Sequence, residues 1–186
     1  MINKLGWKIG GEQGEGIEST AEIFSTVVNT LGYHMYSTRD FASRIKGGHS
    51  NSKICISEEK INVIDYKTDI LIAFDQATLD SYIPELDENS IIIADAKIKP
   101  EISEEIKGLV AVFPITELAK EIANPIIKNI ITLGICSSLL DIDSKLFYDM
   151  IETKFSSKGE EVVNINIQAF DKGREIMTEF MDENGI

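Results

Sequence analysis

Apolar runs of strand length alternate with segments of helical period along the chain, and this alternation restricts the possible folds more than any other feature of the sequence. Residues 69–74 and 90–94 are continuous apolar runs after their first residue. Such runs are typical of central strands that are covered on both faces. Residues 76–82 and 101–107 are each long enough for a short crossover helix. The order strand, helix, strand predicts an α/β fold built on an open, mostly parallel sheet.

The remaining segments extend this pattern toward both ends of the chain. A short apolar strand at 5–9 precedes a segment, 15–31, whose apolar residues recur at the spacing of one helix face. Gly32 follows at the position of a left-handed C-terminal cap. We further expect strands at 33–37 and 108–113, an antiparallel hairpin of 51–57 with 60–65, and a helical C-terminal third comprising 126–140, introduced by Asn124 and Pro125, 143–155 and 160–181. The sequence indicates one domain over 1–181 and a flexible tail at 182–186.

The charge and the cysteine content exclude several classes of function. The chain has 18 Lys and Arg against 31 Asp and Glu, a net charge of −13, which argues against nucleic acid or an anionic membrane as a partner. No apolar run reaches the length of a membrane helix, and the N-terminal apolar stretch is too short for a signal peptide. With only Cys55 and Cys136, two histidines and no Cys-x-x-Cys, a self-contained iron–sulfur cluster is excluded and no metal site is expected. The expected location is the cytoplasm, with free thiols.

The strongest local motif is the glycine-rich segment 9–20, which lies between the first strand and the first helix. Glycines allow backbone amides to approach a phosphate, and a helix N-terminus adds partial positive charge. The dinucleotide fingerprint is imperfect, because Ser19 replaces its third glycine, and the lysine of a phosphate-binding loop is absent. Glu12 and Glu15 would also repel a phosphate. Two interpretations stay open: nucleotide binding, or a tight turn that needs glycine for its dihedral angles.

The second motif is the basic segment 39–50, which carries Arg39, Arg44 and Lys46 in an otherwise acidic chain. It follows the second strand, so in an open α/β sheet it would lie near the crevice beside the glycine-rich segment. The guanidinium group of arginine suits bidentate binding of an anion, and Gly47-Gly48 allows the backbone to approach that anion closely. An anion site and a contact with a partner chain are both compatible with this segment, as is a solvated loop.

The remaining candidate residues are isolated. His34, in an expected strand, is interpreted as a packed histidine, and His49 is the better titrating group. Asp75 ends a central strand, where it could line a site or cap the next helix. No nucleophile, base and oxyanion hole come together, so no catalytic residue is expected and the chain is interpreted as a binding module.

Taken together, the two motifs resemble a known family. Residues 7–20 and the run Phe41-x-Ser43-Arg44-Ile45-Lys46-Gly47-Gly48-His49 resemble the gamma domain of 2-oxoacid:ferredoxin oxidoreductases, which act on pyruvate, 2-oxoglutarate and branched-chain 2-oxoacids. The likeness extends over nearly the whole chain, including 69–75, Asn129-x-x-x-Leu133-Gly134 and the last helix with Ala169-Phe170 and Gly173. The sequence of residues 14–20 is most similar to that of the N-terminal domain of fused gamma–alpha chains.

The resemblance implies a Rossmann-like domain of a larger enzyme that is inactive alone. The complex would oxidatively decarboxylate a 2-oxoacid to an acyl-CoA and pass the electrons to ferredoxin. Thiamine diphosphate, magnesium and iron–sulfur clusters would be held by alpha and beta and, where present, delta subunits, while this chain would contribute coenzyme A binding and assembly. The expected cofactor-binding residues are Gly11, Gly14, Gly16, Arg44, Lys46, Gly47, Gly48 and His49. The alternatives are a nicotinamide- or flavin-binding domain of another oxidoreductase and a scaffold that binds no ligand.

Overall fold

The computed structural model describes residues 3–41, 48–62 and 66–186. The chain divides into two compact units, Met1–Phe113 and Pro114–Ile186. The expectation of one domain over 1–181 stays a prediction. Helix α6 (Glu160–Asn184) continues past the start of the tail expected at 182–186, so residues 182–184 are helical.

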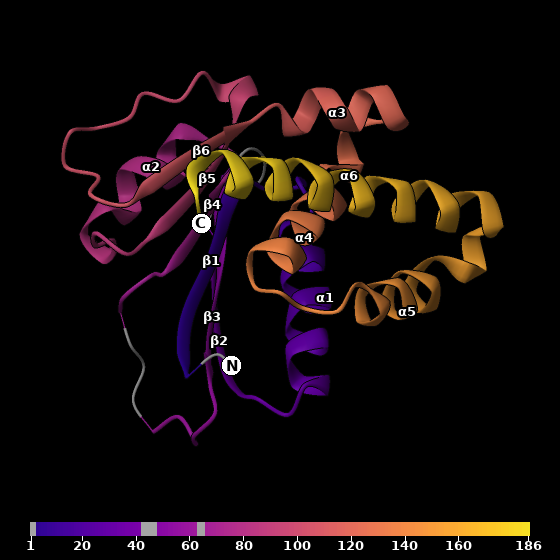
Figure 1. Cartoon of the computed structure of the whole chain (residues 1–186), viewed down its shortest axis with the longest axis horizontal. Coiled ribbons are helices and arrows are strands. Elements are labelled where there is room, and N and C mark those ends of the chain that lie inside the picture. The colour runs from indigo at the N-terminus through magenta and orange to yellow at the C-terminus, as the bar shows by residue number, and fades with distance from the viewer. Residues whose placement is uncertain (1–2, 42–47, 63–65) are drawn as a thin grey trace. The chain divides into compact units, whose positions relative to one another are not determined.

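The first unit is built on a sheet of six strands in the order β2-β3-β1-β4-β5-β6 (Figure 1). Strands β1, β4, β5 and β6 are parallel to one another, and β3 is antiparallel to both β1 and β2. The mostly parallel α/β fold expected from the alternating pattern is therefore confirmed. The strands are β1 (Lys4–Glu12), β2 (His34–Phe41), β3 (His49–Ser57), β4 (Ile70–Ala73), β5 (Ile91–Asp95) and β6 (Leu109–Phe113).

Helices α1 (Ile17–Thr30) and α2 (Gln76–Tyr82) cover opposite faces of this sheet, so the unit has three layers (Figure 1). Alternation along β1 explains the arrangement, because successive side chains of a strand point to opposite faces. Trp7 stacks on Phe24 of α1 with ring centroids 4.6 Å apart. The opposite face of β1 meets α2 at Gly10, where an added Cβ would lie 2.6 Å from the hydroxyl of Thr78. Short 3-10 helices follow α2 and β5, η1 (Ile83–Glu85) and η2 (Ala96–Ile98).

Two sequence-based expectations in this unit are wrong. The strand at 51–57 exists as part of β3, but it pairs with β1 and β2, so both of its edges are used and the described residues 60–62 form no strand. Residues 63–65 lie outside the described part of the chain. The segment 101–107 forms a turn in place of a crossover helix. The hydroxyl of Ser103 accepts the backbone N–H of Glu105, a local bond that competes with helix formation, and Ile106 packs on the core around Leu71.

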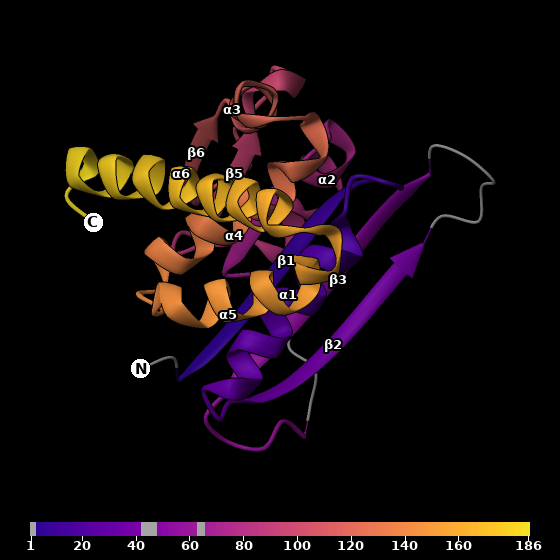
Figure 2. The ribbon, with the colours of Figure 1, turned by 90° about the vertical axis from the view of Figure 1, so that its right-hand side faces the viewer.

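The second unit is helical, as the last third of the sequence predicts. It contains α3 (Ile115–Ile122), which the sequence pattern had not indicated, η3 (Pro125–Ile127), α4 (Lys128–Leu139), α5 (Ser144–Phe155), η4 (Ser156–Lys158) and α6. Figure 2 shows α6 lying across α4 with α5 below it. Residues 128–137 of α4 are all buried, which explains the nearly continuous apolar sequence expected for a buried helix. The Asn124 side chain accepts the N–H of Ile126 at 3.0 Å, which confirms the expected cap.

Two glycines set the distance between α4 and α6. A Cβ added at Gly134 would collide with the carbonyl oxygen of Phe170, and one added at Gly173 would collide with the carbonyl oxygen of Ile131. The two helix backbones are therefore in direct contact at this crossing. Phe147 of α5 packs on Phe170 with ring centroids 5.0 Å apart.

No helix in the described ranges has the length and apolar character needed to cross a bilayer.

Candidate functional site

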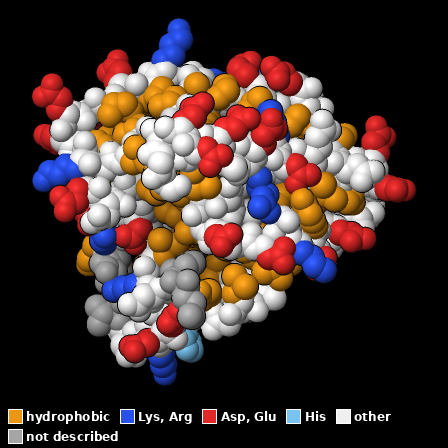
Figure 3. Space-filling model, in the orientation of Figure 1, with side chains coloured by type: hydrophobic (Ala, Val, Ile, Leu, Met, Phe, Trp, Pro, Cys, Tyr) orange, Lys and Arg blue, Asp and Glu red, His pale blue; other side chains and the backbone are white. Residues whose placement is uncertain are grey.

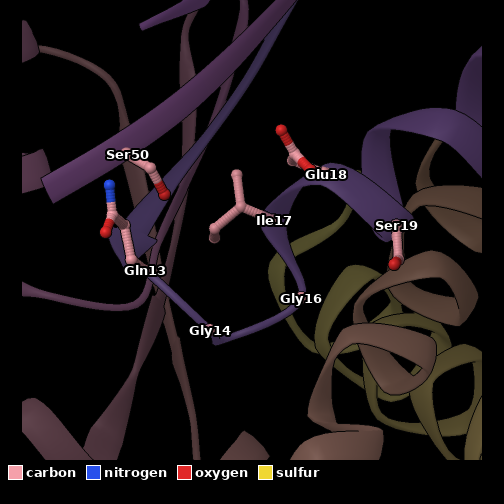
Figure 4. Close-up of a pocket in the computed structure, with 7 residues that line it drawn as sticks. All are labelled: Gln13, Gly14, Gly16, Ile17, Glu18, Ser19 and Ser50. Carbon is pink, nitrogen blue, oxygen red and sulfur yellow. The ribbon is translucent and has the colours of Figure 1, made fainter. Parts of the chain in front are cut away.

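The glycine-rich segment forms the turn between β1 and α1, and a cavity of about 360 Å³ opens beside it. Figure 4 shows Ile17 projecting into the space between Gln13 and Ser50 on one side and Glu18 on the other. Ser50 comes from β3, the strand that follows the basic segment. The cavity is therefore lined both by this strand and by the turn between β1 and α1, which we call the glycine turn. Its lining residues are Gln13, Gly14, Gly16, Ile17, Glu18, Ser19 and Ser50.

Two of the predicted glycines are required by backbone conformation. Gly14 has φ of 96° and Gly16 has φ of 81°, which are left-handed values that other residues rarely adopt. Gly16 is also the residue that precedes α1, and its carbonyl accepts both the N–H and the hydroxyl of Thr20, each at 2.9 Å. No atom lies within 4 Å of a Cβ added at Gly14, so this glycine leaves an open face at the cavity.

Gly11 has a different role from Gly14 and Gly16. A Cβ added there would lie 2.6 Å from Oε2 of Glu15 and 2.9 Å from Cβ of Phe74. The same Glu15 oxygen accepts the backbone N–H of Glu12 at 2.9 Å, and the N–H of Glu15 donates to the Glu12 carbonyl at 3.2 Å. The space that Gly11 leaves is therefore filled by protein, and Gly11 is absent from the residues that line the cavity.

The C-terminal end of the basic segment contacts the glycine turn. The carbonyl of Gly48 accepts the backbone N–H of Gln13 at 3.0 Å. Arg44, Lys46 and Gly47 lie outside the described residues. Arg39 lies on the edge strand β2, where Nη1 is 4.0 Å from Oε1 of Glu18. Within the described ranges, the cavity lining contains one carboxylate, that of Glu18, and no lysine or arginine.

His49 is held by protein groups at both ring nitrogens. Nδ1 lies 3.2 Å from Oδ2 of Asp75, and Nε2 lies 3.4 Å from the hydroxyl of Tyr82. The carboxylate indicates that Nδ1 carries the proton, so that Nε2 accepts from Tyr82. Burial, followed by the nearby charges of Asp40 and Glu85, raises the pKa of Tyr82 to about 12, which keeps this hydroxyl a donor at neutral pH. His49 itself is not among the residues that line the cavity, whereas its neighbour Ser50 is.

Asp75 takes one of the two roles that the sequence left open, since it caps the next helix and is not among the residues that line the cavity. Its Oδ1 accepts the N–H of Thr78 at 2.8 Å, which caps α2, while its Oδ2 faces His49. The interpretation of His34 as a packed histidine is wrong. This residue is exposed because it begins β2, a strand at the edge of the sheet.

Sequence reasoning missed a buried ionic cluster on the α2 side of the sheet. Glu85 bridges two lysines, with Oε1 2.6 Å from Nζ of Lys8 and Oε2 2.9 Å from Nζ of Lys53. Lys8 pairs with Lys53 across β1 and β3, which brings both side chains to one face. Oε2 of Glu85 also accepts the hydroxyl of Thr68 at 2.6 Å. Lys8 within an apolar strand was the available signal, but its partner is 77 positions away in sequence.

Burial lowers the pKa of Lys8, with the hydrogen bond and charge of Glu85 acting in the opposite direction. Burial acts to raise the pKa of Glu85, but hydrogen bonds from Lys8, Thr68 and Lys53 outweigh it and hold that pKa below its ordinary value. Nζ of Lys8 lies 3.6 Å from the ring centroid of Tyr82, so the cluster also supports the residue that contacts His49. None of the cluster residues lines the cavity, which indicates a structural role.

Metal ligation finds no support in the described ranges, where no three His, Cys, Asp or Glu side chains are placed to hold an ion. Cys55 and Cys136 are both buried, and neither forms a disulfide.

Comparison with known proteins gives one consistent result. Residues 6–176 match the family model described as pyruvate ferredoxin/flavodoxin oxidoreductase. The chain is 29% identical over 193 residues to a 2-oxoacid:ferredoxin oxidoreductase subunit alpha of Sulfolobus sp., covering 82% of this chain and 30% of that subunit. The chain thus spans less than a third of that relative's length.

Two solved structures share the fold. A 2-oxoglutarate:ferredoxin oxidoreductase from Magnetococcus marinus, with 2-oxoglutarate, coenzyme A and succinyl-CoA bound, superposes with a TM-score of 0.89 at 26% identity, over 96% of this chain and 32% of that chain. The gamma subunit of a keto/oxoacid ferredoxin oxidoreductase from Geobacter sulfurreducens superposes with a TM-score of 0.79 at 21% identity, over 94% of this chain and 99% of that one. The second match concerns the fold alone.

Proposed function

The chain belongs to the pyruvate ferredoxin/flavodoxin oxidoreductase family, and from this membership we propose that it is the gamma component of a 2-oxoacid:ferredoxin oxidoreductase. The complex would oxidatively decarboxylate a 2-oxoacid to an acyl-CoA and transfer the electrons to ferredoxin. This chain would contribute to coenzyme A binding and to assembly, and its partners would carry out the chemistry.

The observation that carries this proposal is the match to the Magnetococcus marinus enzyme. It covers 96% of this chain, and that structure contains coenzyme A and succinyl-CoA. Because the match includes both compact units, the whole chain would correspond to one part of such an enzyme. The Sulfolobus subunit alpha, of which this chain covers 30%, supports the more specific proposal that it resembles the gamma-type part of a fused gamma–alpha chain.

The residues at the glycine turn are compatible with part of coenzyme A. Gln13, Ser19 and Ser50 supply amide and hydroxyl groups, and Gly14 leaves an open face. Arg44 and Lys46 precede Gly48, whose carbonyl is bonded to the turn, so we propose that they supply the positive charge that the phosphates of coenzyme A need. Since acidic side chains are spread over the visible face in Figure 3, such a local positive charge would matter for a polyanionic ligand.

The proposal places the remaining cofactors on other chains. Thiamine diphosphate, magnesium and iron–sulfur clusters would be held by alpha and beta and, where present, delta subunits. The cysteine content is compatible with this division, because the chain has only Cys55 and Cys136, whereas a cluster is usually held by about four thiolates.

Calorimetry of the chain with coenzyme A, NAD and FAD in parallel tests the proposed role. We expect heat of binding with coenzyme A and none with NAD or FAD. Desulfo-coenzyme A should bind more weakly than coenzyme A only if the thiol contributes to the affinity. Binding of NAD or FAD in place of coenzyme A would favour the domain of another oxidoreductase. Binding of none of the three, together with normal assembly with alpha and beta subunits, would indicate a scaffold.

A further inference from the structure

The side chain of Glu15 is folded back over the glycine turn. Its Oε2 accepts the backbone N–H of Glu12 at 2.9 Å, and the N–H of Glu15 donates to the Glu12 carbonyl at 3.2 Å. Gly11 makes this position available, because a Cβ there would lie 2.6 Å from the same oxygen. The turn therefore binds a carboxylate that the chain itself supplies.

The backbone N–H of Glu12 is a donor of the kind that binds phosphate in a glycine-rich turn. Turns between a strand and a helix bind phosphate through backbone N–H groups, assisted by the partial positive charge of the helix N-terminus. Here the N–H of Glu12, the last residue of β1, already has an anionic acceptor 2.9 Å away. A phosphate at the same place would have to displace Glu15 or accept its repulsion at short distance.

The lining of the cavity beside the turn adds to this electrostatic effect. Glu18, in the first turn of α1, is the one carboxylate of the described lining, which contains no lysine or arginine; Glu15 lies in the same turn but is not itself a lining residue. Arg39 of β2 lies 4.0 Å from Oε1 of Glu18, and its side chain is 46% exposed. The other polar lining groups, Gln13, Ser19 and Ser50, are uncharged.

We propose that Glu15 is a specificity-determining residue whose carboxylate acts as the resident anion of the glycine turn and excludes phosphate groups from it. A ligand would then enter this cavity with an uncharged, hydrogen-bonding part, and its phosphates would lie outside the turn. The identity of that ligand as coenzyme A rests on the proposed function, whereas the exclusion of phosphate rests on the contacts of Glu15 alone.

The test measures binding of inorganic pyrophosphate to the whole chain at low salt, by calorimetry. Glu15→Gln removes the charge while its amide oxygen can still accept the Glu12 N–H, and Glu15→Ala removes the acceptor as well. We expect pyrophosphate to bind at least about tenfold more tightly to Glu15→Ala than to the wild type, with Glu15→Gln between them, since repulsion between charges a few ångströms apart amounts to a kilocalorie or more.

Glu22→Gln is the matched control. Glu22 is exposed on α1, outside the cavity lining, and its replacement changes the net charge by the same amount. An equal gain of pyrophosphate affinity in Glu22→Gln would show a general charge effect and overturn the proposal, as would no gain in either Glu15 variant. If Glu15→Ala fails to fold, Glu15→Gln against Glu22→Gln decides. A wild type that binds no coenzyme A would contradict the proposed function and leave this comparison valid.

Discussion

At the scale of single residues, the buried ionic cluster shows how strongly one carboxylate can constrain a sheet. Lys8 and Lys53 are 4% and 6% exposed, and both ammonium groups depend on Glu85 for their charge partner. Removing that carboxylate would leave two buried cations, which costs more free energy than an exposed ion pair contributes.

We therefore expect Glu85→Gln to lower the free energy of unfolding by about 3 kcal/mol, measured by urea denaturation at neutral pH. The pKa of Glu85 is lower in the folded protein than in the unfolded chain, so its stabilisation is complete above the unfolded pKa and is lost as the pH falls through the folded pKa. The variant should lose this acid dependence. Glu117→Gln, which breaks an exposed pair with Lys120, is the control and should cost less than about 1 kcal/mol. Equal effects of the two substitutions would contradict the assignment.

Gly16 provides a second prediction at this scale. Because its φ of 81° is left-handed, Gly16→Val should destabilise the chain by about 1–3 kcal/mol through backbone strain. Gly16→Asn should cost less, since asparagine adopts this conformation more readily than other residues. Thermal unfolding of both variants measures the difference. If valine and asparagine are equally tolerated, the turn does not require a left-handed residue.

At the scale of elements, the crossing of α4 and α6 depends on the absence of two side chains. Alanine in place of glycine ordinarily stabilises a helix by about 1 kcal/mol. At Gly134 the added methyl group would collide with the Phe170 carbonyl, and α6 would have to move.

We expect Gly134→Ala to destabilise the chain by about 2 kcal/mol, a sign opposite to that of intrinsic helix propensity. Chemical denaturation gives the value. The control is Glu179→Ala on the exposed side of α6, which should change stability by less than about 0.5 kcal/mol. A Gly134→Ala variant more stable than the wild type would show that the two helices are not in backbone contact.

At the scale of the whole molecule, the net charge of −13 repels any polyanionic ligand, which therefore needs a local positive charge to bind. We expect the Arg44→Ala, Lys46→Ala double variant to weaken coenzyme A binding, by a ceiling of roughly 1.5–3 kcal/mol for each lost contact. The wild-type affinity should also fall as salt rises, because exposed charges are screened over about 10 Å at 0.1 M.

Lys145→Ala is the control for this double variant, since Lys145 lies on α5 in an exposed pair with Asp149. Normal coenzyme A binding with failed assembly would assign the basic segment to a partner contact. Unchanged coenzyme A affinity and unchanged assembly together would show that the segment performs neither role.

A further prediction concerns the catalytic activity of the chain without its partners. We expect the chain alone to be inactive with pyruvate or 2-oxoglutarate, coenzyme A, thiamine diphosphate and a viologen dye, because the proposed function assigns thiamine diphosphate and the iron–sulfur clusters to partner chains. Addition of alpha and beta subunits should restore turnover. Turnover by the purified chain by itself would contradict the division of labour that we propose.

Local signals in the sequence determined most elements of this protein. The apolar runs at 69–74 and 90–94 predicted β4 and β5, and the helical spacing of 15–31 predicted α1. Asn124 was recognised as a capping residue, and Gly32 as a left-handed residue, with φ of 88°. These signals are readable because strand alternation, helix period and capping involve residues a few positions apart.

Only the tertiary structure decided what these elements contact. The sequence of 51–57 specified a strand but not its neighbours, which proved to be β1 and β2. Lys8, Lys53 and Glu85 meet only because strand register and the position of η1 bring them together. Glu15 was recognisable in sequence as a charge unfavourable to phosphate, but its bond to the Glu12 N–H depends on the space left by Gly11. Strand pairing, burial and charge contacts join residues that are far apart in the sequence. A single sequence therefore does not reveal them, and they are seen only in the folded chain.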